Sequence, residues 1–161
     1  MVEIKYVQKD IRVHLRVQLY NAHKFYKQLT LWDPGAVISV FNHTDLRRLG
    51  LPVLSSPKSS YTGFGGTVIE SYLVTIPKMT IGDITLTNIV VSTPVNHNIP
   101  VTSVLGMNII GMFNTHLCTN IKTITLDQVY YSSQDYVKSC DNVSDEILSL
   151  CVPQSQDSFE K

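Results

Sequence analysis

The sequence predicts an all-β domain in which a single short helix interrupts many short strands. Residues 11–20 alternate apolar and polar side chains almost without exception, which is the period of a strand with one buried face. Further short apolar runs continue as far as residue 126, separated by Gly, Pro, Asn and Asp. Up to residue 126, a helical pattern is confined to residues 42–50. Together these observations favour a β-barrel or a β-sandwich.

The first two strands predict a hairpin. Asn21-Ala22-His23 supplies a turn after strand 11–20, and residues 26–32 return as the second strand. Asp33-Pro34-Gly35 then breaks the strand pattern, and residues 36–41 follow as another short strand. The chain therefore resumes an extended course directly after the break.

The one predicted helix of the domain covers residues 42–50. Asn42 or Thr44 is suited to cap its first turn, because their side-chain oxygens accept hydrogen bonds from the free amides of a helix N-terminus. Gly50 is suited to end it, because glycine readily adopts the left-handed conformation that often follows the last turn.

The middle of the chain predicts two more hairpins. Residues 52–66 are rich in Pro, Ser and Gly, and they predict a loop that leads to a hairpin tip at Thr62-Gly63-Phe64-Gly65-Gly66. Segments 68–76 and 79–91 predict further strands. Gly82-Asp83, within the second segment, has the composition of a two-residue hairpin turn.

The last short strands lie within residues 101–126, and we assign residues 1–127 to one domain. Residues 128–161 form a polar tail, in which 144–151 predict one short helix. The tail ends in residues that have almost nothing to bury, which predicts disorder. The tail either packs on the domain or is a linker within a longer protein.

Composition and charge limit the classes of function. A chain of 161 residues, 43% of them hydrophobic, can bury one substantial core. Thirteen basic and thirteen acidic residues cancel, so we expect neither nucleic acid nor a membrane as a partner. The three cysteines form no compact disulfide framework, and the first residues show no signal-peptide pattern, so we expect a cytoplasmic protein. The five histidines lack the spacing of a metal site, and no metal is expected.

Asp33 is the candidate catalytic residue. By itself, Asp-Pro-Gly is most simply a turn. Here it follows the apolar strand 29–32 and precedes Gly35, Ala36 and an apolar run to Val40, so apolar segments flank it on both sides. This context favours a functional carboxylate over a surface turn.

Four blocks within residues 11–127 resemble the retropepsin-like aspartic proteases, the retroviral type with one Asp-x-Gly motif per chain. The loop Asp33-Pro34-Gly35-Ala36 resembles the Asp-Thr-Gly-Ala loop of that family. Thr62-Gly63-Phe64-Gly65-Gly66 has the glycine pattern of a flap tip, and residues 81–91 are similar to the hairpin that follows the flap. Val104-Leu105-Gly106, with the Asn and the apolar start of a helix that come next, resembles the motif that closes the fold.

The resemblance implies a closed, six-stranded acid protease barrel with one short helix. It implies an aspartic endopeptidase that acts as a homodimer on an extended peptide or protein substrate and needs no metal or organic cofactor. Asp33 from each of two subunits would form a pair about 3 Å apart, one carboxylate activating a water and the other hydrogen-bonded to the substrate carbonyl. Phe64 would either cover the bound peptide or pack on the flap of the partner.

Pro34 departs from the family pattern. The Thr or Ser that the family has at this position donates its hydroxyl and its amide across the dimer axis, and proline has neither donor. An active protease and a non-catalytic dimeric module that binds a partner therefore both remain open, and we favour the protease because Asp33, Gly35 and Ala36 are present. A third interpretation is an unrelated β-barrel binding domain in which Asp33 only forms a turn.

Two other features have weaker functional interpretations. His116 and Cys118 would share one face of a strand, where they could form a nucleophile or metal pair. Trp32 is more simply a packing residue than a substrate contact.

Overall fold

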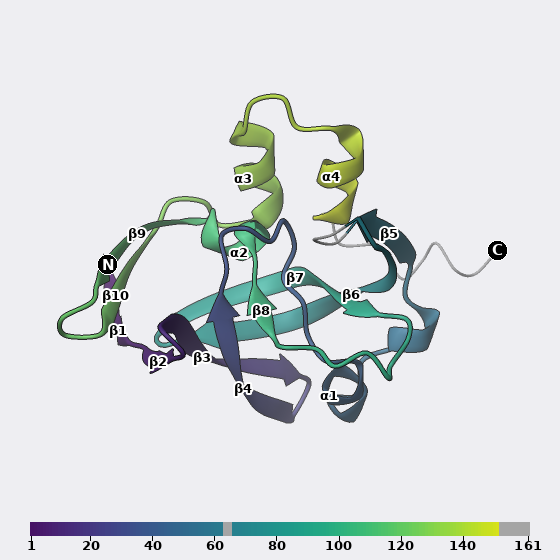
Figure 1. The fold of residues 1–161 in the computed structure, drawn as a ribbon, viewed down its shortest axis with the longest axis horizontal. Coiled ribbons are helices and arrows are strands. Elements are labelled where there is room, and N and C mark those ends of the chain that lie inside the picture. Colours follow the sequence, from purple (N-terminus) through teal and green to yellow (C-terminus); the bar gives the residue numbers. More distant parts are fainter. Residues whose placement is uncertain (63–65, 152–161) are drawn as a thin grey trace.

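The structure is a computed structural model that describes residues 1–62 and 66–151 (Figure 1). Its strands are β1 (Val2–Lys5), β2 (Val7–Lys9), β3 (Arg12–Asn21), β4 (Lys24–Trp32), β5 (Lys58–Thr62), β6 (Val68–Ile81), β7 (Ile84–Pro94), β8 (Val104–Leu105), β9 (Phe113–Cys118) and β10 (Thr123–Gln128). Its helices are α1 (His43–Arg48), α2 (Met107–Ile110), α3 (Ser133–Ser139) and α4 (Asp145–Leu150), with a 3-10 turn at Val53–Ser55. The prediction of a mainly β fold is confirmed, but the expectation of one short helix in the barrel and one in the tail is wrong.

The hairpin predicted from the alternating segment is present as β3 and β4. Their pairing ends at Asn21↔Lys24, so Ala22 and His23 form the turn. Ala22 has a φ of 52°, the left-handed conformation that tight hairpin turns require. The apolar residues of the alternation are buried at Leu15, Val17 and Leu19.

Strands β6 and β7 form a hairpin that is longer than the one predicted from the sequence. The two strands expected around Pro77 are one continuous strand, β6. Pro77 is exposed and makes no ladder pair, since the register passes from Ile76↔Ile89 to Lys78↔Thr87. The turn at Gly82 and Asp83 is confirmed, and Gly82 has a φ of 56°.

The strands form two sheets. The larger has seven strands in the order β5-β6-β3-β4-β8, with β2 paired to β3 and β7 paired to β6, and the smaller has the order β1-β10-β9. Within the described residues, no pairing of strands closes the larger sheet on itself, so the expected closed barrel is not found. A single residue, Val40, bridges Ser92 of β7 to Val104 of β8. Among the described residues, an isolated bridge and not a strand ladder therefore joins the two edges.

The strand expected over residues 36–41 is reduced to that bridge. The carbonyl of Ala36 accepts a hydrogen bond from the Met107 amide at 2.7 Å, and the carbonyl of Val37 accepts one from the Asn108 amide at 3.1 Å. These carbonyls complete the N-terminus of α2 and are not available to a β-ladder. Local sequence does not reveal this, because the partners are far apart in the chain.

The helix predicted over residues 42–50 is α1. The Asn42 side-chain oxygen accepts hydrogen bonds from the amides of Thr44 and Asp45, so Asn42 is the cap. Gly50 follows the helix with a φ of 80°. In the tail, α4 is the helix predicted over 144–151, and it is capped by Ser144.

Helix α3 was not predicted, and α2 was expected only as the helix start that the resemblance to the closing motif implies. The four residues of α2 are too few to show helical periodicity. The segment of α3 is polar and buries only Ser133 and Val137, so it lacks a wide apolar face.

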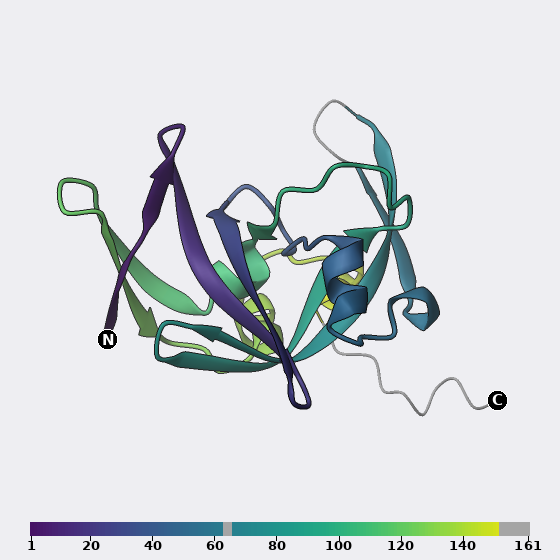
Figure 2. The same ribbon diagram turned by 90° about the horizontal axis from the view of Figure 1, so that it is seen from below.

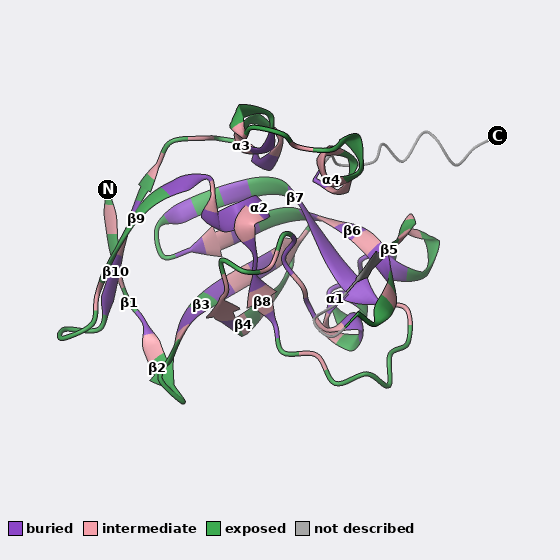
Figure 3. Ribbon diagram, turned by 45° about the horizontal axis from the view of Figure 1, so that its top comes forward, coloured by how far each residue is buried: buried purple, intermediate pink, exposed green. Residues whose placement is uncertain are grey.

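The core lies between the main sheet and the helices α1 and α2. Figure 3 shows buried residues along β3, β6, β7 and α2. Phe41, Leu105 and Ile109 are each at most 1% exposed and belong to the same core cluster. Trp32 packs against this cluster, as expected. No helix in the described part of the chain is long and apolar enough to cross a bilayer.

The tail helix α3 lies against α2 (Figure 1). The ring of Tyr136 covers Gly111 so closely that a Cβ added to Gly111 would lie 2.0 Å from Tyr136 Cζ. The hydroxyl of Ser133 donates to the carbonyl of Asn108. The described part of the tail therefore packs on the domain, which was one of the two interpretations from the sequence.

We predict that Gly111→Ala displaces α3. The new methyl group would overlap the Tyr136 ring, and we expect the free energy of unfolding to fall by about 1–3 kcal/mol in urea denaturation. In a Tyr136→Ala background the obstacle is gone, and the same substitution should cost less than about 0.5 kcal/mol. An equal cost in both backgrounds would contradict this explanation.

Candidate active site

Asp33 is positioned by the parallel pairing of β4 with β8. The last pair of this ladder is Trp32↔Leu105, and the next amide, that of Asp33, donates to the Leu105 carbonyl at 3.1 Å. The ladder stops there, because Pro34 has no N–H with which to continue it. The Asp33 side chain stands partly exposed at the end of a strand whose backbone is held by the core.

The Asp33 carboxylate is oriented by its own loop. Its Oδ1 accepts a hydrogen bond from the amide of Gly35 at 2.9 Å. A Cβ at position 35 would lie 3.1 Å from this oxygen, so a larger residue would crowd the carboxylate. The amide of Ala36 donates to the carbonyl of Asp33 at 3.2 Å and closes the turn. One carboxylate oxygen is thus fixed in direction, and Pro34 is exposed at the tip of the turn.

The predicted closing motif lies against this loop. The amide of Gly106 donates to the Ser39 hydroxyl oxygen at 2.9 Å. A Cβ on Gly106 would lie 2.7 Å from the carbonyl carbon of Ile38, which is backbone and cannot move aside. Only glycine fits this approach, so the structure brings the Asp33 loop and the motif Val104-Leu105-Gly106 together.

Two residues that were not predicted as site residues, Ser39 and Asn108, join these segments. Asn108 Oδ1 accepts hydrogen bonds from the Ser39 amide and from the Ser39 hydroxyl, both at 2.8 Å. Asn108 Nδ2 donates to the carbonyl of Val90 in β7, also at 2.8 Å. Asn108 is 1% exposed, and Ser39 is fully buried. The sequence signal that could have identified Asn108 is its amide side chain, which lies within an otherwise apolar segment.

The hairpin of β5 and β6 carries the segment predicted as a flap. A strand, β5, replaces the second half of the loop expected over residues 52–66, and it pairs with β6 as far as Thr62↔Val68. Gly66 has a φ of 82°, which glycine permits. Figure 2 shows this hairpin and the loop after β4 directed toward the same side of the molecule. The predicted tip residues Gly63, Phe64 and Gly65 lie outside the described residues, and their contacts stay predictions.

The thiols of Cys118 and Cys151 are not placed to act as nucleophiles. The Cys118 thiol, on the exposed strand β9, donates to Asn120 at 2.9 Å instead of contacting a base. Burial raises the pKa of the Cys151 thiol to about 11, so this thiol stays protonated and is a poor nucleophile. Burial also raises the pKa of Tyr136 to about 12. Within the described ranges, no group of three His, Cys, Asp or Glu side chains is placed to hold a metal ion.

The fold of the chain is similar to that of a solved protease. The crystal structure of a retropepsin-like aspartic protease from Rickettsia conorii superposes with a TM-score of 0.59. The alignment has 19% sequence identity and covers 78% of this chain and 89% of that chain. At this identity the likeness shows the fold, which is retropepsin-like. No curated protein matches the chain.

The family follows from the sequence itself. The family model described as "gag-polyprotein putative aspartyl protease" matches residues 26–112, which is more than half of the chain. The match includes β4, the Asp33 loop and the closing motif. The chain belongs to this family of retropepsin-like aspartyl proteases.

We predict that Asn108→Ala destabilises the fold by about 3 kcal/mol, measured by urea denaturation. The substitution leaves the Ser39 amide, the Ser39 hydroxyl and the Val90 carbonyl buried without their partner, and each such loss costs about 1–3 kcal/mol before relaxation. Asn114→Ala on the exposed strand β9 is the control and should stay within about 0.5 kcal/mol of the parent. Equal effects of the two substitutions would show that the network carries no special stability.

Proposed function

We propose that the chain is an aspartic endopeptidase that acts as a homodimer, with Asp33 of each subunit in one shared site. The observation that carries this proposal is the carboxylate of Asp33, partly exposed at the end of β4 and oriented by the Gly35 amide. Membership of an aspartyl protease family supports the same chemistry.

The chemistry requires two carboxylates in opposite protonation states. The ionised one activates a water, and the protonated one donates a hydrogen bond to the carbonyl of the scissile peptide. The chain has one Asp-x-Gly loop, so a two-fold axis beside Asp33 would supply the second carboxylate. Like charges about 3 Å apart share one proton, and the apparent pKa values then belong to the pair.

The segments near the proposed site suit an extended peptide. Among the described residues, the loop after β4, the β5–β6 hairpin and the loop after β7 carry the exposed apolar side chains of Val37, Val68 and Ile99, respectively. A peptide in β conformation can satisfy its backbone on strand edges while its side chains contact such apolar groups. These surfaces would be covered by the substrate or by the second subunit.

Pro34 favours a second candidate function, a dimeric module that binds a partner without cleaving it. Its ring is exposed beside Asp33 and offers neither an amide nor a hydroxyl to a neighbouring subunit. In this alternative the surface beside Asp33 holds a peptide, but the two carboxylates are not kept in the geometry that catalysis requires.

We predict that Asp33→Asn abolishes peptide cleavage. The amide keeps the shape of the carboxylate but cannot act as a base, and we expect the rate to fall by at least about 100-fold. The measurement is cleavage of a peptide library from acidic to neutral pH, followed by mass spectrometry, with light scattering to report the dimer. Asp83→Asn, in the exposed β6–β7 turn, is the matched control and should cleave as the parent does. A parent dimer that cuts nothing at any pH would favour the binding module.

We predict that Pro34→Thr strengthens the dimer. The threonine restores an amide and a hydroxyl at the exposed tip of the loop, and hydrogen bonds worth about 1 kcal/mol each should lower the dissociation constant by about tenfold or more. Pro34→Ala restores only the amide and should have a smaller effect. Sedimentation velocity over a range of concentrations measures both variants. Unchanged self-association in both would place Pro34 away from the dimer axis.

A further inference from the structure

A groove of about 670 Å³ lies over the outer face of the β3–β4 hairpin, between this hairpin, β1 and the turn of β6 and β7. Its volume falls within the range of sites that hold ligands. The pairing registers place Arg16 opposite Leu29 and Gln18 opposite Lys27, so all four side chains project from one face of the sheet. None of the residues of the Asp33 loop lines this groove.

The groove has a strong local charge. Lys5, Arg16 and Lys27 line it, and no acidic residue is among the described lining residues. Lys78 lies beside it, with its ammonium 4.5 Å from the centroid of the Tyr20 ring. The three salt bridges found among the described residues involve none of these four cations. In a chain of zero net charge, the described lining of this groove therefore carries a local excess of positive charge.

The lining also offers groups that suit a peptide. The Tyr20 hydroxyl donates to the side-chain oxygen of Gln18, which leaves the Gln18 amide nitrogen to face other partners. Leu29 is 37% exposed in the same groove and gives an apolar contact. An arginine matches the planar geometry of a carboxylate, and lysines add point charges around it.

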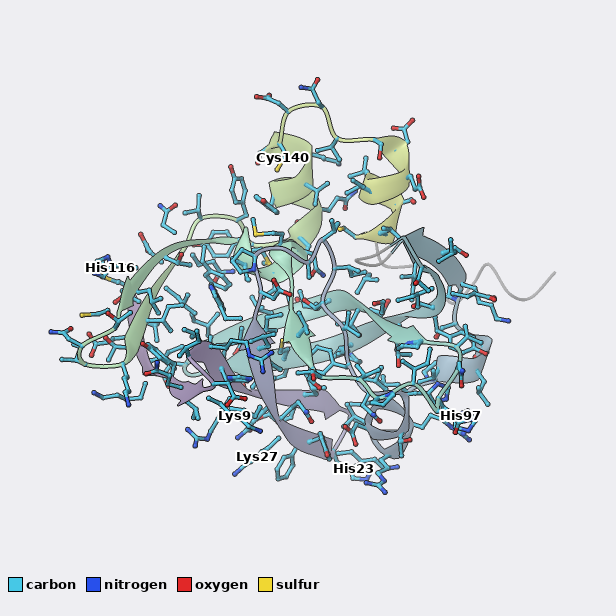
Figure 4. All side chains as sticks on the ribbon, viewed as in Figure 1. Lys9, His23, Lys27, His97, His116 and Cys140 are labelled. Atoms are coloured by element: carbon cyan, nitrogen blue, oxygen red, sulfur yellow. The ribbon has the colours of Figure 1, made fainter. Side chains whose placement is uncertain are left out.

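We propose that this groove binds an acidic segment of a partner protein, with Glu or Asp side chains at Arg16 and Lys27 and an apolar side chain over Leu29. Figure 4 shows Lys27 directed outward from the sheet. The proposal goes beyond the proposed protease activity and does not depend on it. Asp33 lies six positions after Lys27 along the extended chain of β4, a span of about 20 Å, so the groove and the Asp33 loop are separate places on the protein.

A single-stranded nucleic acid is the main rival for a basic groove, and the aromatic contacts disfavour it. Base stacking needs an aromatic ring with a free face. Tyr20 is the aromatic residue among the described lining, and its ring is covered by Lys78 and packs 6.2 Å from Phe25. The groove therefore offers charge without a stacking platform.

The test is fluorescence anisotropy with the full chain carrying Asp33→Asn, so that no probe is cleaved and the outcome is independent of the proposed activity. The probe is a labelled peptide in which Glu alternates with Ser around a central Leu, and the matched probe has Gln in place of every Glu. We expect saturable binding of the Glu peptide only. The double variant Arg16→Gln, Lys27→Gln should weaken it by about tenfold or more, because two charge contacts are lost.

The charge-matched control is the double variant Arg47→Gln, Lys138→Gln, at two exposed positions on α1 and α3. It removes the same charge and should bind as the parent does. Thermal melting of all variants checks that they fold. No saturable binding of the Glu peptide, or an equal loss in the control, would overturn the proposal. Tighter binding of an oligothymidylate of equal charge would also overturn it, in favour of nucleic acid.

Discussion

The arrangement around Asp33 depends on one buried amide, the side chain of Asn108. Its oxygen takes both donors of Ser39, and its nitrogen holds the carbonyl of Val90. Because all of these groups are out of water, none of them has another partner that would satisfy it as well. The Asp33 loop, the closing motif and β7 therefore have one relative position in which the Ser39 donors and the Val90 carbonyl are all paired with Asn108. The close approach of Gly106 to Ile38 then excludes small shifts of that position.

The tail is connected to the same centre. Ser133 donates to the carbonyl of Asn108, so one residue is bound through its side chain to the Asp33 loop and through its backbone to α3. Tyr136, seated on Gly111, fixes the helix that carries Ser133. The polar composition of this segment concealed its role, since α3 docks through one ring and one hydroxyl and not through a broad apolar stripe.

The local sequence pattern was sufficient to predict those features that depend on contacts between residues close together in the chain. The β3–β4 hairpin, the Asn42 cap of α1 and the Asp33–Gly35 contact each involve residues a few positions apart, and the alternation or the turn residues predict them. Residues 36–41 have the composition of a strand but serve the start of α2, and barrel closure failed as a prediction at the same segment. Both depend on partners more than fifty residues away, which no short window of sequence contains.

Ser39 and Asn108 are 69 residues apart in the sequence, and this separation also determines the order in which parts of the protein fold. A two-residue turn joins β3 to β4, so that hairpin can form early and at small entropic cost. The Asp33 loop gains its fixed shape only after a large loop has closed and the chain as far as α2 has folded back upon β4. A nascent chain that has not yet produced Asn108 carries Asp33 without the framework that orients it. During synthesis, the Asp33 loop can therefore reach its final geometry only after most of the chain has been made.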